Sequence, residues 1–204
     1  MKKSLFVLLL VLFLGVFGAP SVALAGEMYH SSGQNAYAYF SAIDPSSSGC
    51  TWVEAAVGPN SGKYQTPPGR GTSGTDAWVF VHMYDYCTYA EKAGWGSAQL
   101  SDQAFKVGST FARLTATIMV EDLIYGGSFP VTIDLTWAGA KPAMRQSDHE
   151  HIHSQGFSLN YRWTGMYQLA DATGTISDGT TNYTPEASID GNFGTGRTML
   201  VRVE

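Results

Sequence analysis

Two segments in the middle of the chain alternate apolar and polar residues with a period of two. In residues 112–121 apolar residues occupy the even positions, and in residues 131–137 they occupy the odd positions. Strict alternation of this kind is typical of half-buried β-strands. The pair Gly126–Gly127 lies between the two segments and suits a hairpin loop. We therefore expect the two segments to pair as antiparallel strands.

Residues 77–87, with the sequence AWVFVHMYDYC, form the most apolar segment outside the N-terminal stretch. In an extended strand, Val79 and Val81 would share one face, and Trp78 and Phe80 the other. A strand that is apolar on both faces belongs in the middle of a fold. We therefore expect it in the interior of a sheet rather than at its edge.

Shorter patterns predict the rest of the fold. Further strands are expected at residues 36–43, 51–57, 157–163, 166–176 and 198–203. Polar or Gly- and Pro-rich loops are expected at residues 26–35, 58–75 and 139–156. Residues 88–102 are ambiguous and could include a turn of helix, and residues 191–196 (GNFGTG) are expected to form a turn. The predicted fold is all-β: one antiparallel β-sandwich domain of jelly-roll or Ig-like type over residues 26–204, with roughly eight to ten strands and little helix.

The N-terminal stretch, residues 1–25, has the features of a signal peptide. Lys2 and Lys3 precede an apolar run, and Ala23-Leu24-Ala25 forms a small-residue cleavage site before Gly26. The apolar run is too short for a membrane-spanning helix, so no transmembrane segment is expected. The leader is of bacterial type and predicts a secreted or periplasmic protein that is cleaved after Ala25.

The charge balance argues against two classes of partner. Without the two leader lysines, the chain has ten basic and 17 acidic residues, a net charge of −7. No stretch of the sequence concentrates basic residues. Nucleic acid and anionic membranes are therefore not expected as partners.

The two cysteines, Cys50 and Cys87, are expected to form a disulfide, because exported proteins fold where disulfides persist. The alternative is a pair of unrelated buried thiols. A CxxC redox motif is absent from the sequence.

A histidine cluster is the most concentrated set of candidate ligands. In an extended backbone His149, His151 and His153 would point the same way and could supply nitrogen ligands to zinc or copper. The first and third would lie roughly 13 Å apart in a flat strand, so one ion would need a bend or a ligand from elsewhere, such as His82 or His30. Solvated loop residues, or a pH-sensitive or ligand-contacting role, are the alternatives.

Aromatic residues are the second candidate site. The chain has five tryptophans and eleven tyrosines. On an exposed sheet face they could stack on sugar rings, and otherwise they would fill the core. Trp78 and Trp137 lie within apolar alternation and are expected in the core. Trp95 lies between two glycines and is the candidate for ligand contact.

No familiar catalytic constellation is present. The sequence contains no GxSxG elbow, and a carboxylate pair for glycoside hydrolysis, such as Glu54 with Asp85, depends on a separation that sequence does not give. The first hypothesis is an exported, non-catalytic binding or cell-surface interaction module, with a glycan or a surface protein as partner. The alternative is a metal-binding protein or metalloenzyme that uses the histidine cluster, and a glycoside-cleaving enzyme is the weaker third.

Overall fold

The computed structural model describes residues 27–43, 47–66, 70–154, 157–180, 182–184 and 188–203, so the predicted leader and its cleavage site lie outside the described residues. Within these ranges the chain forms eleven strands: β1 (Glu27–Ile43), β2 (Thr51–Thr66), β3 (Arg70–Asp85), β4 (Glu91–Leu100), β5 (Phe105–Val107), β6 (Phe111–Asp122), β7 (Ser128–Gly139), β8 (Met144–Ser154), β9 (Phe157–Ser177), β10 (Asn182–Tyr183) and β11 (Asp190–Val203). All of their pairings are antiparallel. The all-β prediction is confirmed.

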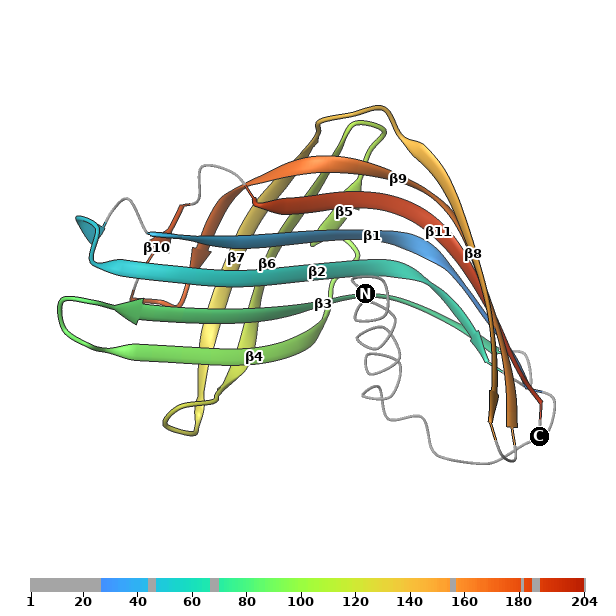
Figure 1. Cartoon of the computed structure of the whole chain (residues 1–204), viewed down its shortest axis with the longest axis horizontal. Helices are drawn as coiled ribbons and strands as arrows, with labels where there is room; N and C mark the ends of the chain where they lie inside the picture. The colour runs from blue at the N-terminus through green and yellow to red at the C-terminus, as the bar shows by residue number, and fades with distance from the viewer. Residues whose placement is uncertain are drawn as a thin grey trace.

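Eight of the described strands are hydrogen-bonded in a closed circuit. The order runs β9–β11–β1–β2–β3–β4–β6–β7, and β7 pairs in turn with the second half of β9. The predicted pairing of residues 112–121 with residues 131–137 is the β6–β7 hairpin. Figure 1 shows β6 and β7 crossing behind β1–β4 at a steep angle, which gives the sandwich-like arrangement two layers.

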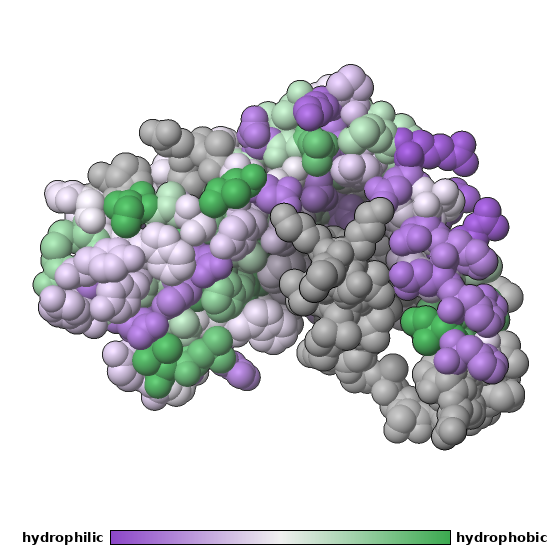
Figure 2. Space-filling model, viewed as in Figure 1, coloured by the Kyte–Doolittle hydropathy of each residue, from purple (hydrophilic) through white to green (hydrophobic). Residues whose placement is uncertain are grey.

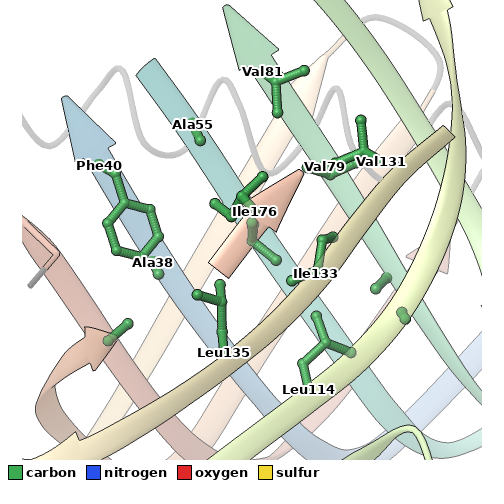
Figure 3. Packing of buried hydrophobic residues seen from close by; sticks show 14 of the residues in the cluster. Ala38, Phe40, Ala55, Val79, Val81, Leu114, Val131, Ile133, Leu135 and Ile176 are labelled. Atoms are coloured by element: carbon green, nitrogen blue, oxygen red, sulfur yellow. The ribbon is translucent and has the colours of Figure 1, made fainter. Parts of the chain in front are cut away.

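The space between these layers holds the hydrophobic core. In this region alternate residues of β1, β2 and β3 face β6 and β7, and Figure 3 shows buried side chains of both layers, among them Phe40, Val79 and Leu135. Val79 and Leu135 are fully buried, and burying a side chain of this size contributes ~1.5–3 kcal/mol. Trp137 is also fully buried, and its indole nitrogen donates to the carbonyl of Tyr37 at 2.7 Å. We call this two-layered region the packed half.

The long strands continue beyond the packed half as a single layer. This region, the extension, comprises residues 27–35, 59–66, 70–76, 144–154, 157–167 and 194–203. Figure 1 shows these strands turning downward toward their far ends. In the part of the chain that the structure describes, no helix is both long and apolar enough to cross a membrane.

A row of five glycines crosses the extension. The paired residues are, from β9 through β11, β1 and β2 to β3, Gly165, Gly196, Gly33, Gly62 and Gly74. A Cβ atom on Gly33 would lie 2.3 Å from the carbonyl oxygen of Ser61, and one on Gly62 would lie 2.6 Å from that of Ser32. Glycine therefore allows a close approach of neighbouring backbones here, as it does where sheets bend.

Several sequence-based assignments are wrong in the extension. Residues 26–35, 58–75 and 139–156 were expected to be loops, but β1, the β2–β3 pair and β8 occupy most of them. Residues 191–196 lie within β11 rather than in a turn. In the packed half, the ambiguous segment 88–102 contains the strand β4 at residues 91–100. A single layer that meets solvent on both sides needs no apolar face, so the alternation that marks a strand disappears.

The predicted disulfide is confirmed. Cys50 and Cys87 are bonded, with Cα atoms 5.5 Å apart, and join the start of β2 to the residues after β3. The amide of Tyr86 also donates to the carbonyl of Cys50 at 2.8 Å. The carboxylate of Asp85 accepts hydrogen bonds from the backbone amides of Cys87 and Thr88, at 2.7 and 2.9 Å. Both hydrogen bonds lower the pKa of the Asp85 carboxyl, and the one from Thr88 has the larger effect.

Candidate functional site

Aromatic side chains cover the outward side of β1–β4 in the packed half. Because apolar residues at alternate positions of these strands enter the core, the residues between them face outward. We call these outward-facing side chains the aromatic face. Its members are all half-buried, and they are Tyr37, Tyr39, Trp52, Trp78, Phe80, Tyr84 and Trp95.

Small residues lie between or beneath the rings of the aromatic face. Tyr39, Phe80 and Trp95 lie in one cross-strand row, with Ala56 between the first two. Trp78 lies over Gly58, since a Cβ atom on that glycine would be 2.2 Å from the indole nitrogen.

The Trp78 ring also contacts its neighbour on the same face. Its centroid lies 6.2 Å from that of Tyr37, and the two rings are tilted by 40°. Burial raises the pKa of the Tyr37 phenol, with a further contribution from the negative charge of Asp190. The half-buried rings are thus held by packing and still present part of their surface to solvent.

Polar groups lie among the rings. The Tyr39 hydroxyl donates to Oε1 of Glu54 at 2.6 Å, and this hydrogen bond raises the pKa of Tyr39. His82 Nε2 lies 2.8 Å from Oε1 of Glu91, and the His82 ring meets Trp52 edge-on at 5.4 Å. Each carboxylate is therefore oriented by a neighbour, and its second oxygen can accept a hydrogen bond from a ligand.

The three tryptophans singled out from the sequence have different positions. Trp137 lies in the core, as expected. The expectation of a core position for Trp78 is wrong, because residues of the opposite parity in β3 fill the core and Trp78 faces outward. Trp95 is half-buried on the same face, in the row that includes Phe80. The prediction that Trp95 contacts a ligand stays a prediction.

The two carboxylates considered for glycoside hydrolysis are held separately. Glu54 lies on the aromatic face, hydrogen-bonded to Tyr39. Asp85 is paired with Thr51 in the ladder and caps the turn after β3. Residues at even and odd positions of β3 point to opposite sides, so Asp85 does not share the face on which Glu54 lies.

The histidine cluster lies on β8, which pairs on one side with β9. His149, His151 and His153 are exposed and point to one side of the strand. The His151 and His153 rings are stacked, with centroids 6.2 Å apart. His151 Nδ1 also lies 2.7 Å from the side-chain oxygen of Asn160.

The structure does not bring the two proposed additional ligands to this cluster. His30 lies on β1, and the register from β1 through β11 and β9 separates it from His149 by three strand spacings, about 14 Å. His82 lies in the packed half with Glu91. Within the described residues, no group of three or more His, Cys, Asp or Glu side chains could hold a metal ion. Metal binding by the β8 histidines stays a prediction.

Sequence reasoning missed a group of basic side chains. No stretch of sequence concentrates them, yet the extension brings together Lys63, Arg145, Arg162 and Arg197 from four different strands. Two of them directly follow glycines of the glycine row, at Gly62 and Gly196.

Comparison with known proteins adds no assignment: no family model matches the chain, and no curated protein matches its sequence.

Proposed function

We propose that this protein is a non-catalytic binding module that recognises carbohydrate on the aromatic face. The observation that carries the proposal is the set of half-buried rings on the outward side of β1–β4, with Trp52, Trp78 and Trp95 among them. Tryptophan and tyrosine supply large contact areas at low cost in side-chain entropy. A sugar ring offers an apolar C–H surface that fits this chemistry.

The polar groups on the same face support a ligand rich in hydroxyls. Glu54 and Glu91 each hold one oxygen in a hydrogen bond to the protein and keep another acceptor position. The Trp78 ring is fixed by Tyr37 and Gly58 before any ligand arrives. Such preorganisation lowers the entropic cost of binding. These groups suit recognition rather than catalysis, because Glu54 is hydrogen-bonded to Tyr39 and Glu91 to His82.

The proposal includes export from the cytoplasm. It is supported by the Cys50–Cys87 disulfide, a bond that persists in oxidising compartments. It is also supported by the basic start, apolar run and cleavage site of residues 1–25. Intact-mass measurement of protein recovered from an exporting host should give a chain that begins at Gly26. A chain that retains Met1 and residues 2–25 would contradict export by cleavage.

A glycan array tests the binding function. The exported protein should retain at least one glycan, and Trp95→Ala and Trp78→Ala should each weaken binding of that glycan. Truncating a central aromatic anchor costs about 2 kcal/mol, close to a 30-fold rise in Kd. Tyr125→Ala is the matched control, because Tyr125 is 75% exposed in the β6–β7 loop and should leave affinity unchanged.

Two results would contradict the proposal. One is the absence of any retained glycan on an array where the wild-type protein is folded by circular dichroism. The other is a bound glycan whose affinity is the same for the wild type and both tryptophan variants. If the aromatic face instead binds a surface protein, the array is silent and the carbohydrate assignment fails.

A further inference from the structure

The side of the extension that continues from the core is basic. The β1–β11 and β1–β2 registers run from the packed half into the extension without a break. Positions that are apolar and buried in the packed half therefore share a side of the sheet with polar positions in the extension. On β1, for example, Ala38 and Ala36 are followed on this side by Gln34, Ser32 and His30. We call this side of the extension the basic face.

Residues paired across neighbouring strands lie on the same side of a sheet. One row of the basic face consists, from β8 to β3, of Ser147, Thr164, Arg197, Ser32, Lys63 and Ser73. The next row consists of His149, Arg162, Met199, His30 and Gln65. Arg145 lies one row nearer the packed half, opposite Met166. Among the described residues, no Asp or Glu belongs to this face of the extension, whereas Asp148 and Glu150 point to the other side of β8.

These basic side chains line two adjoining open hollows. The larger, of about 530 Å³, includes Lys63, Arg162 and Arg197, and the second, of about 470 Å³, includes Arg145 and Arg197. The two hollows share Ser32, Thr164 and Arg197, so they form one continuous groove. Figure 2 shows hydrophilic residues gathered at the end of the molecule where β8 and β9 turn downward.

No carboxylate among the described residues balances the charges of this groove. Lys63, Arg145, Arg162 and Arg197 are exposed, and the described residues contain no ion pair to any of them. By contrast, two other cations of the described chain, Lys92 and Arg113, each have a carboxylate partner. Four unpaired cations on one face of an acidic protein form a local site of positive potential.

We propose that this groove binds a linear acidic polysaccharide. Arg145 on β8 and Lys63 on β2 are separated by four strand spacings, about 19 Å, which exceeds the size of a single small anion. A chain with repeated anionic groups can meet successive cations, and the planar arginine fork pairs with carboxylate or sulfate through two hydrogen bonds. Ser32, Thr164 and Gln65 supply partners for sugar hydroxyls.

A polysaccharide fits this groove better than a nucleic acid does. Proteins that hold single strands combine a basic groove with aromatic side chains on which bases stack. On the described part of the basic face there is no aromatic side chain; Tyr161 and Trp163 point to the other side of β9.

This inference does not depend on carbohydrate recognition by the aromatic face. The two surfaces lie on opposite sides of the sheet and in different halves of the molecule. A Trp95→Ala variant should therefore bind an acidic polysaccharide as the wild type does. A wild-type protein that retains no neutral glycan and still binds a polyanion would remove only the first proposal.

The test uses labelled polygalacturonate and dextran sulfate oligomers, with neutral dextran and a single-stranded DNA of matched charge as comparisons. Fluorescence anisotropy at low salt should show binding of at least one acidic polysaccharide and none of neutral dextran. The double variant Arg162→Gln/Arg197→Gln should raise the Kd at least about tenfold, because it removes the central pair of cations. The matched double variant Lys106→Gln/Lys141→Gln changes the net charge equally and should leave the Kd within about twofold.

Binding of polygalacturonate alone would identify carboxylate as the recognised group, and binding of dextran sulfate alone would identify sulfate. Three outcomes would overturn the proposal: no binding of either oligomer, tighter binding of the DNA, or an equal loss in the lysine control. Circular dichroism and thermal unfolding of both double variants establish that the fold is retained. The substituted side chains are exposed, so both variants should unfold at the wild-type temperature.

Discussion

The disulfide should account for a substantial part of the stability of the fold. We consider the double variant Cys50→Ala/Cys87→Ala. The two cysteines are separated by 37 positions in the sequence, and the segment between them is the β2–β3 pair. In the chain-entropy treatment, closing a loop of this length restricts the unfolded chain enough to stabilise the folded state by about 4 kcal/mol.

Urea unfolding followed by circular dichroism measures this loss. With a slope of about 2 kcal/mol per molar urea, the midpoint of the double variant should fall by about 2 M. Wild-type protein unfolded with a thiol reductant should show a similar fall, and the double variant should not respond to the reductant. A loss below about 1 kcal/mol would refute the reasoning, because it would mean that the unfolded chain is already restricted without the bond.

Three further perturbations test the packing, the glycine row and the histidines. Lys92→Met should cost about 3–5 kcal/mol by urea unfolding, because it removes the cation that lies 2.6 Å from Asp178, whose side chain is 3% exposed. Gly33→Ala should cost about 1–3 kcal/mol, because the added Cβ would lie 2.3 Å from a backbone carbonyl oxygen of β2. Zinc should not remain stoichiometric after chelator-free dialysis, because the stacked His151 and His153 rings supply two ligands where a tight site needs three or four. Weak zinc binding in a titration should be lost in His153→Ala.

Each of these has a control within the chain. Adding Asp178→Asn to Lys92→Met should recover part of the lost stability, since no buried carboxylate charge then lacks its cation. Gly74→Ala lies in the same glycine row as Gly33, but its Cβ would meet only a flexible Gln99 side chain, at 3.2 Å, and should cost little. Equal losses in Gly33→Ala and Gly74→Ala would contradict the close-approach argument. Stoichiometric zinc after dialysis would show that the β8 histidines recruit a further ligand.

The sequence predicted the packed half well because burial leaves a pattern. Residues 112–121 and 131–137 alternate in sequence, and their apolar positions are buried in β6 and β7. Residues 77–87 were apolar on both faces, and this placed them correctly in the middle of the sheet. The hydropathy of this segment did not show which of its two faces enters the core and which forms the aromatic outer surface. Trp78 was therefore assigned to the wrong side, since an aromatic residue beside a core strand has the same hydropathy on either face.

The extension could not be predicted in the same way. Its strands meet solvent on both sides, so residues 139–156 and 26–35 show no apolar period, and their glycines suggest loops. Only the pairing of β8 with β9 and of β1 with β11 reveals that these segments are strands. The β1–β11 pairing joins distant parts of the chain, and the β8–β9 hairpin, although its strands are adjacent in sequence, has no apolar period that would specify its register.

Predicting the basic face would have required two further pieces of information, the parity of the core positions on each strand and the order of the strands in the sheet. On β1, β2 and β11 the apolar core positions have a fixed parity, even on β1 and odd on the other two, and Ser32, Lys63 and Arg197 have the same parity as the core residues of their own strands. Extending each strand beyond its apolar part therefore predicts that these three side chains face one side. It does not predict that they are neighbours, because that requires the order β11–β1–β2. Charge gathered across strands, rather than along the chain, is visible only after the sheet has been assembled, and for that reason the composition of the whole chain does not reveal this face.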